Sequence, residues 1–388
     1  MSSKMISNRV KEIPFSGIRK FFELVQKSKD IVSLGVGEPD FPTPEPLKDA
    51  GVRAIENDFT SYTSNYGLLE LRERIAEKLK KKNSIDRNPE TEILITTGVS
   101  EALDIAIRAI LNPGDEILIP EPSYVSYKPC VWFAHGNPVP VPSKEENEFR
   151  VLTEDIKGRI TKKTRAIILS SPNNPTGSVL RKKDLEEISD IVIENDLIVI
   201  SDEIYEELIY DDEKHYSIGS FNGMTDRTIT LNGFSKAYAF TGWRLGYAAG
   251  NSEFIESMMK IHQYTMLCAP SVSQHAALEA FRYENYVGDM VKEYDRRRRL
   301  LVKGLNEIPD ISCIMPKGAF YTFPNIKNTG IKSEKFAERL LKEGGVAVVP
   351  GSTFGDCGEG YIRCSYSVSR ESIDEALRRI ERFMEKLG

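Results

Sequence analysis

The chain has 388 residues, of which 40% are hydrophobic and 28% charged, proportions that exclude a disordered, collagen-like or coiled-coil protein. Its formal net charge of -6 provides no overall basic field, so neither nucleic acid nor an anionic membrane is indicated as a partner. Five cysteines without a CxxC pair indicate reduced thiols in the cytoplasm, and four widely spaced histidines disfavour a metal site.

The N-terminal residues contain no apolar stretch of the kind that forms a secretion signal. The proline-rich segment Pro39–Pro46 then marks a predicted boundary. We expect an N-terminal segment, residues 1–45, that joins a small domain, followed by a large domain, residues 46–285.

The middle of the chain alternates short apolar runs with helical patterns such as Ser100–Leu111 and Lys183–Glu194. This alternation predicts an α/β fold in which helices cover both faces of a mostly parallel sheet. The predicted strands are Ile93–Thr96, Glu116–Ile119, Ala166–Leu169, Leu197–Ile200, Thr228–Leu231 and Gly246–Ala249.

The last hundred residues have a different pattern, which predicts a smaller α+β domain, residues 286–388. Helices are expected at about Tyr286–Asn306, Ser333–Glu343 and Ser372–Lys386, with strands at 346–350 and 361–367 between them. Just before this domain, Ile261–Leu278 carries no Asp, Glu, Lys or Arg. It is too polar for a membrane span, so we expect a buried segment at a subunit or domain contact.

The segment TLNGFSKAYAFTGWRLGYAAG carries two cations, Lys236 and Arg244, in otherwise uncharged surroundings. Desolvation lowers the pKa of a lysine and makes its amine usable for imine formation. On position alone, a reactive lysine with a partner arginine and two surface cations with buried stems explain this pattern about equally well.

Three other segments place polar groups after predicted strands. The turn SPNNPTG follows one strand, Asp202 ends another with Tyr205 three residues later, and Gly98 precedes a helix. Ligands of open α/β sheets bind at this edge, and free N–H groups at a helix start hold anions such as phosphate. Taken singly, each segment is also explained by an ordinary turn or a helix cap.

Together, NNPTG, SDEIY and SKAYAFTGWRLG, in this order, resemble the class I aminotransferases among the fold-type-I pyridoxal-phosphate enzymes. The resemblance extends from about Glu12 to the C-terminus. It implies a large domain with a mostly parallel seven-stranded sheet that binds pyridoxal 5'-phosphate, a smaller α+β domain, and a homodimer.

The resemblance also implies roles at the cofactor. Lys236 would bind it covalently, Asp202 would pair with its pyridinium nitrogen, and Arg244 would hold its phosphate. Asn174 and Tyr205 resemble the pair that hydrogen-bonds its phenolic oxygen. Lys236, Asp202 and Tyr205 are thus the predicted catalytic residues. Further implied cofactor contacts are Gly98, Val99, Ser100, Tyr124, Ser235 and Tyr62, the last reaching the phosphate site of a partner subunit.

For the substrate, Arg363 resembles the arginine that binds the α-carboxylate, with Gly37 and Asn174 as further contacts. The aspartate-specific branch of the family uses a second arginine for the distal carboxylate, but Ile261–Leu278, where it is expected, has none. Arg19 or Arg108 could serve instead. The segment Phe15–Phe22, which contains Arg19 and Lys20, is the candidate for a pocket wall, and an ordinary amphipathic lead-in helix explains it equally well.

The resemblance therefore implies transfer of the amino group of aspartate or an aromatic amino acid to 2-oxoglutarate, by a ping-pong aldimine/ketimine mechanism. Small amino and oxo acids are the expected partners, without nucleic acid or membrane. A β-lyase, an alanine-type aminotransferase and a non-catalytic pyridoxal-phosphate-binding regulator remain alternatives, since a fold does not determine a reaction.

Overall fold

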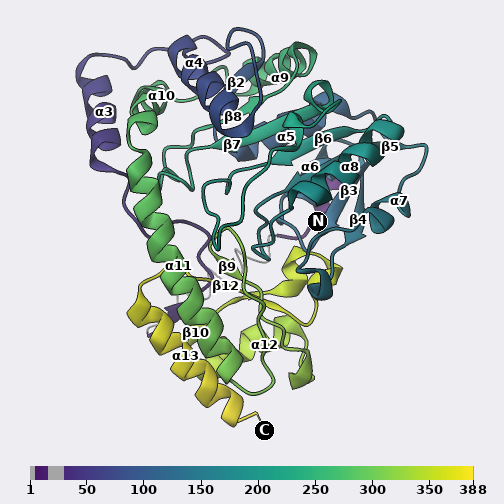
Figure 1. Ribbon diagram of the computed structural model, residues 1–388, viewed down its shortest axis with the longest axis vertical. Helices are drawn as coiled ribbons and strands as arrows, with labels where there is room; N and C mark the ends of the chain where they lie inside the picture. Colours follow the sequence, from purple (N-terminus) through teal and green to yellow (C-terminus); the bar gives the residue numbers. More distant parts are fainter. Residues whose placement is uncertain (1–4, 16–29, 388) are drawn as a thin grey trace.

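The computed structural model describes residues 5–15 and 30–387. Its main feature is a sheet of seven strands, ordered β2-β8-β7-β6-β5-β3-β4 (Figure 1). β8 runs antiparallel to both of its neighbours, and the other pairs are parallel. The strands are β2 (Ile93–Thr96), β3 (Glu116–Glu121), β4 (Asn137–Pro142), β5 (Thr164–Ser170), β6 (Ile198–Asp202), β7 (Thr228–Gly233) and β8 (Gly246–Ala249).

Both faces of this sheet are buried because alternate side chains of a strand point to opposite faces. In β3, for example, Ile117 and Ile119 pack on one side and Leu118 on the other. α5 (Val99–Ile110), α6 (Tyr127–Phe133) and α9 (Ser252–Thr265) contribute to the first apolar layer, and α7 (Thr153–Lys157) and α8 (Lys182–Glu194) to the second. The α/β architecture with seven strands is as predicted.

The predicted strands and helices of the sheet region recur within a few residues, but β4 was not identified individually. Its sequence, NPVPVP, alternates proline with valine, a composition that argues against a central strand. β4 pairs only with β3 and lies at the edge of the sheet, where a missing N–H costs no ladder hydrogen bond.

A third apolar layer covers the β2–β8 end of the sheet. It includes residues of α3 (Glu45–Glu56), α4 (Leu69–Lys78) and α10 (Ser271–Leu278). The expected buried segment, Ile261–Leu278, covers the end of α9 and all of α10 and is only partly buried: His262 and Gln274 are fully covered, whereas Tyr264 is 86% exposed. α3 begins at Glu45, within the proline-rich stretch predicted as a boundary.

The C-terminal part forms two small sheets under three helices (Figure 1). β1 (Val32–Ser33) pairs in parallel with β10 (Val346–Ala347), while β12 (Ile362–Ser365) pairs antiparallel with β11 (Val349–Pro350) and β9 (Tyr321–Thr322). α11 (Glu284–Glu307), α12 (Ser333–Arg339) and α13 (Arg370–Glu385) share one apolar core with them. The pairing of β1 with β10 joins the N-terminal segment to this part; the domain boundaries at 45 and 285 stay predictions.

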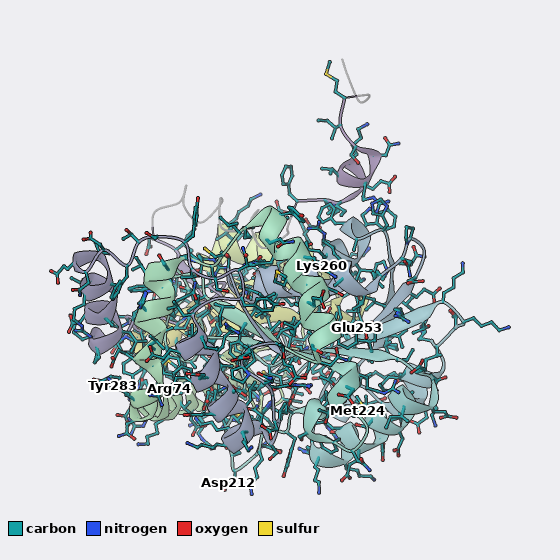
Figure 2. All side chains as sticks on the ribbon, turned by 90° about the horizontal axis from the view of Figure 1, so that it is seen from above. Arg74, Asp212, Met224, Glu253, Lys260 and Tyr283 are labelled. Carbon is teal, nitrogen blue, oxygen red and sulfur yellow. The ribbon has the colours of Figure 1, made fainter. Side chains whose placement is uncertain are left out.

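The remaining elements are short. α1 (Asn8–Glu12) buries none of its residues and projects from the body of the chain (Figure 2), and its Arg9 donates a hydrogen bond to the Trp132 carbonyl oxygen of α6 at 2.7 Å. π-helical turns follow α4 at Leu79–Asn83 and α12 at Leu340–Gly344, and 3₁₀ turns cover Glu145–Asn147, Ile218–Ser220, Thr225–Arg227, Ala280–Arg282, Lys327–Thr329, Gly351–Phe354 and Asp356–Gly358. Among the described residues, no helix has both the length and the apolar character needed to cross a bilayer.

Candidate active site

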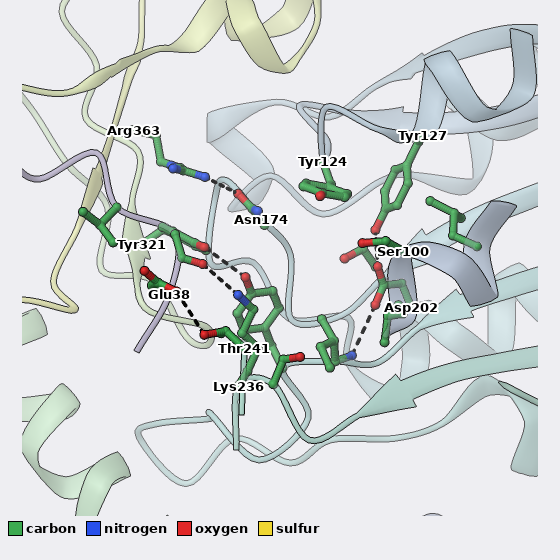
Figure 3. A pocket seen from close by; sticks show the side chains of 18 of the residues that line it. Glu38, Ser100, Tyr124, Tyr127, Asn174, Asp202, Lys236, Thr241, Tyr321 and Arg363 are labelled. Carbon is green, nitrogen blue, oxygen red and sulfur yellow. Dashed lines mark hydrogen bonds between the residues drawn. The ribbon is translucent and has the colours of Figure 1, made fainter. Parts of the chain in front are cut away.

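A cavity of about 350 Å³ opens at the carboxyl ends of β5, β6 and β7, and residues of β9 and β12 close its other side (Figure 3). Asp202 ends β6, and Lys236 follows β7 by three residues. Eleven of the predicted site residues line this cavity: Gly37, Val99, Ser100, Tyr124, Asn174, Asp202, Tyr205, Ser235, Lys236, Arg244 and Arg363. The strand edge thus brings together segments that are far apart in the sequence.

Lys236 projects its amine into the cavity. Its Nζ donates a hydrogen bond to the Gly37 carbonyl oxygen at 2.7 Å and lies 5.8 Å from the centre of the Tyr205 ring. Burial lowers the pKa of Lys236 to about 8, and the positive charges of Arg363 and Arg244 act in the same direction. Near neutral pH an appreciable share of this lysine is therefore the free amine, the form that acts as a nucleophile or base.

Asp202 is a buried carboxylate held by two neutral donors. The Tyr127 hydroxyl donates to Oδ2 at 2.7 Å, and the Ile204 amide donates to Oδ1 at 3.3 Å. Burial raises the pKa of Asp202 to about 6, while these hydrogen bonds oppose the shift. Asp202 is consequently an anion at neutral pH, without a cation bonded to it among the described residues, and it faces the cavity.

Arg363, on β12, lies on the opposite wall and is 1% exposed. Its Nη1 donates to Asn174 Oδ1 at 3.0 Å and its Nη2 to the Gly35 carbonyl oxygen at 2.9 Å, while the ring of Tyr321 lies 4.4 Å from its guanidinium carbon. The buried Nε has no hydrogen-bond partner among the described residues. A guanidinium fixed in this way presents a planar set of donors, which suits a carboxylate.

The start of α5 and Arg244 form an anion cradle beside the cavity. Gly98 has a φ of +78°, a left-handed conformation that favours glycine, and a Cβ placed there would displace the Arg244 guanidinium, whose Nη2 would lie 2.6 Å from it. The first amides of a helix have no intrahelical acceptor, and here they belong to Val99 and Ser100, which line the cavity. These N–H groups and the guanidinium together would bind a phosphate.

Two tyrosines meet at the Asn174 side. The hydroxyl oxygens of Tyr205 and Tyr321 are 2.9 Å apart, and burial raises the pKa of both phenols. Both side chains therefore keep their protons at neutral pH, and each hydroxyl can donate one hydrogen bond.

Tyr62, Arg108 and Arg19, all predicted for the site, are not found in the described cavity lining. Tyr62 is 82% exposed and does not line the cavity of its own chain, so its predicted role toward a partner subunit stays a prediction. Arg108 pairs with Asp104 on the surface, 3.2 Å away, and does not line the cavity either. Arg19 lies outside the described residues.

Sequence reasoning missed Tyr127 and Tyr321, which bond to Asp202 and Tyr205. It also missed Glu38, whose Oε2 accepts a hydrogen bond from the Thr241 hydroxyl at 3.0 Å and whose charge opposes the lowering of the Lys236 pKa. Only proximity to a recognised motif could have pointed to these residues: Tyr127 lies three residues after Tyr124, and Glu38 directly follows Gly37.

Known proteins resemble this chain in architecture and in sequence. The sequence model of the family described as aminotransferase class I and II matches residues 29–380. The chain belongs to this family. It is a pyridoxal-phosphate-dependent enzyme of class I with the fold-type-I architecture.

Individual relatives of the aminotransferase are similar over nearly their full length. An aspartate aminotransferase of Pyrococcus abyssi is 52% identical over 98% of both chains, and aromatic-amino-acid aminotransferase 2 of Thermococcus litoralis is 48% identical, also over 98% of both. The crystal structure of an aromatic aminotransferase from Pyrococcus horikoshii superposes with a TM-score of 0.91, at 52% identity over 96% of this chain and all of that one.

The cavity of the aminotransferase fits pyridoxal phosphate on three observations. The free amides at the start of α5 and the Arg244 guanidinium beside Gly98 offer converging donors for a phosphate. Asp202 is an anion without a bonded cation among the described residues, which matches a protonated pyridine nitrogen. Lys236 offers an amine of lowered pKa between these two features.

Proposed function

We propose that this aminotransferase transfers the amino group of aspartate or of an aromatic L-amino acid to 2-oxoglutarate by a ping-pong mechanism. The relatives named aspartate and aromatic aminotransferase support these donors. The observation that carries the proposal is the position of a lysine of lowered pKa in one cavity with a buried carboxylate and a buried arginine.

Pyridoxal phosphate, when bound, supplies an electron sink for the electrons released at the substrate Cα. In the proposed mechanism, Arg363 and Asn174 hold the α-carboxylate, and Gly37 contributes a backbone contact. Such a clamp would hold Cα within reach of Lys236, whose Nζ would accept the Cα proton and later release it. Because the pKa of Lys236 is about 8, its amine can take up and release this proton near neutral pH.

Asp202 and Tyr205 would set the electrostatics of the site. The anionic carboxylate of Asp202 stabilises positive charge on the ring nitrogen, and Tyr127 orients that carboxylate. The Tyr205 hydroxyl, with Asn174, donates to the phenolic oxygen. Val99, Ser100, Ser235 and Arg244 would hold the phosphate, and Tyr124 would lie against the ring.

The cavity walls support aromatic donors. Tyr124, Tyr127 and Tyr321 line it together with the apolar Val36 and Leu103. Its described cations are Lys236, Arg244 and Arg363, and each already has a proposed partner, so a distal carboxylate needs another cation. We therefore expect broad specificity, with a cation from outside the described cavity lining for the distal carboxylate, and Arg19 is the candidate.

A homodimer is the proposed active unit. Three exposed aromatic side chains support it: the exposed fractions are 94% at Phe15, 82% at Tyr62 and 86% at Tyr264. A subunit interface would remove this aromatic surface from water. We place the enzyme in the cytoplasm on the five free thiols.

A screen of aspartate, phenylalanine, tyrosine and alanine as donors to 2-oxoglutarate tests the substrate proposal. We expect turnover with aspartate and with both aromatic donors. Turnover with alanine alone would overturn it. Sedimentation of the active enzyme tests the dimer, and a fully active monomer would contradict that part.

A further inference from the structure

The cavity contains a pair of tyrosine hydroxyls that the described mechanism uses only in part. Tyr205 follows β6, and Tyr321, labelled in Figure 3, begins β9. Both line the cavity, and their hydroxyl oxygens are 2.9 Å apart. The exposed fractions of Tyr205 and Tyr321 are 4% and 1%, so water cannot easily replace either partner. Each phenol has one proton, and one of the two hydroxyls must therefore donate to the other.

The charges around the two tyrosines decide which hydroxyl donates the hydrogen bond. The Arg363 guanidinium lies over the Tyr321 ring at 4.4 Å and lowers the proton affinity of that phenol. Arg363 also lowers the proton affinity of Tyr205, but its guanidinium lies over the Tyr321 ring. At Tyr205 the anion of Asp202 opposes this effect, whereas no carboxylate of the described residues acts on Tyr321. The Tyr205 oxygen is therefore the better acceptor. Lys236 also faces the Tyr205 ring, and Tyr124 faces Tyr321. Tyr321 is thus the donor, and the proton of Tyr205 remains for the cavity.

We propose that Tyr321 is a positioning residue for Tyr205: its hydroxyl donates to the Tyr205 oxygen and so directs the Tyr205 proton into the cavity. The inference rests on the proposed role of Tyr205 toward the phenolic oxygen of the cofactor. A hydroxyl that accepts one hydrogen bond is polarised and becomes a stronger donor in the next. Tyr321 would then strengthen the Tyr205 hydrogen bond without touching the cofactor itself.

The test is the pH titration of the visible absorption of the holoenzyme. A donor at the phenolic oxygen stabilises the deprotonated form of the bound cofactor, so losing the donor moves the midpoint to higher pH. Tyr321→Phe keeps the ring beneath Arg363 and removes only the hydroxyl. We expect an upward shift of about half to one pH unit, the three- to tenfold change that one neutral hydrogen bond supplies.

Tyr366→Phe is the matched control. Tyr366 is a fully buried tyrosine whose hydroxyl donates to the Ala319 carbonyl oxygen at 3.0 Å, and it does not line the cavity. Its loss should leave the midpoint unchanged. Tyr321→Leu also lacks the hydroxyl and serves as a second variant in case Tyr321→Phe folds poorly. We expect it to shift the midpoint in the same direction.

A double-mutant cycle with Tyr205→Phe separates the inference from the function on which it rests. We expect Tyr205→Phe alone to raise the midpoint and Tyr321→Phe to add nothing in that background. An unchanged midpoint in Tyr205→Phe would overturn the proposed role of Tyr205. A shift in Tyr205→Phe with none in Tyr321→Phe, or equal shifts by Tyr321→Phe in both backgrounds, would overturn the positioning role of Tyr321.

Discussion

Replacing Asp202 with asparagine should make the protein more stable and the enzyme much slower. Burial raises the pKa of Asp202 from 3.8 to about 6, so the folded protein holds this proton more tightly than the unfolded chain does. Protonated Asp202 therefore stabilises the folded protein relative to the unfolded chain. This contribution is complete below pH 3.8, the pKa of an aspartate in the unfolded chain, and is lost as the pH rises through about 6. A difference of about two pKa units corresponds to about 3 kcal/mol, the upper limit of the cost of ionised Asp202 above that pH.

The asparagine of the Asp202→Asn variant cannot ionise. Its amide oxygen can still accept the Tyr127 hydroxyl, whereas the Ile204 amide loses its acceptor, at a cost of about 1 kcal/mol that does not depend on pH. The apoprotein of this variant should therefore unfold at higher urea concentration than the parent at pH 8, and the gain should disappear near pH 4. Without the anion, the ring nitrogen loses its counter-charge, and the single-turnover rate with saturating amino acid should fall by about 10²–10³. A single-turnover rate within about tenfold of the parent, or equal stability gains at both pH values, would refute the reasoning.

Three further substitutions test other parts of the site. Gly98→Ala places a Cβ 2.6 Å from Arg244 Nη2 at a φ of +78°, so equilibrium dialysis should show at least about tenfold weaker cofactor binding, and unchanged binding would contradict the cradle. Arg363→Lys loses the planar donor set and should raise KM for all amino and oxo acids by about ten- to a hundredfold; an effect on one substrate class alone would speak against an α-carboxylate role. Arg19→Ala should raise KM for dicarboxylates and leave aromatic donors nearly unchanged, and equal or absent effects would exclude Arg19 from the pocket.

The sequence was sufficient for the parts of the site that lie in local motifs. Lys236 and Arg244 occur in one uncharged segment, and Asp202 ends an apolar strand, so their positions at the sheet edge follow from chain order and strand periodicity. The alternation of apolar strands and helices likewise determined the α/β architecture.

The missed features depend on contacts between distant residues or on exceptions to composition. Tyr127 and Asp202 are 75 residues apart, and Tyr205 and Tyr321 are 116 residues apart, so neither hydrogen bond has a local signal. The proline-rich β4 is stable because an edge strand needs no N–H on its outer side. Tyr62 is 82% exposed, so the packing of a single chain does not define its role.

The central claim is that Lys236 carries the cofactor, and one measurement tests it most directly. Borohydride reduction of the holoenzyme, followed by proteolysis and peptide mapping, locates the lysine that bears the pyridoxyl group. We expect the group on Lys236, the lysine whose buried amine has a pKa of about 8 and faces the cavity. A pyridoxyl group on any other lysine would contradict the account.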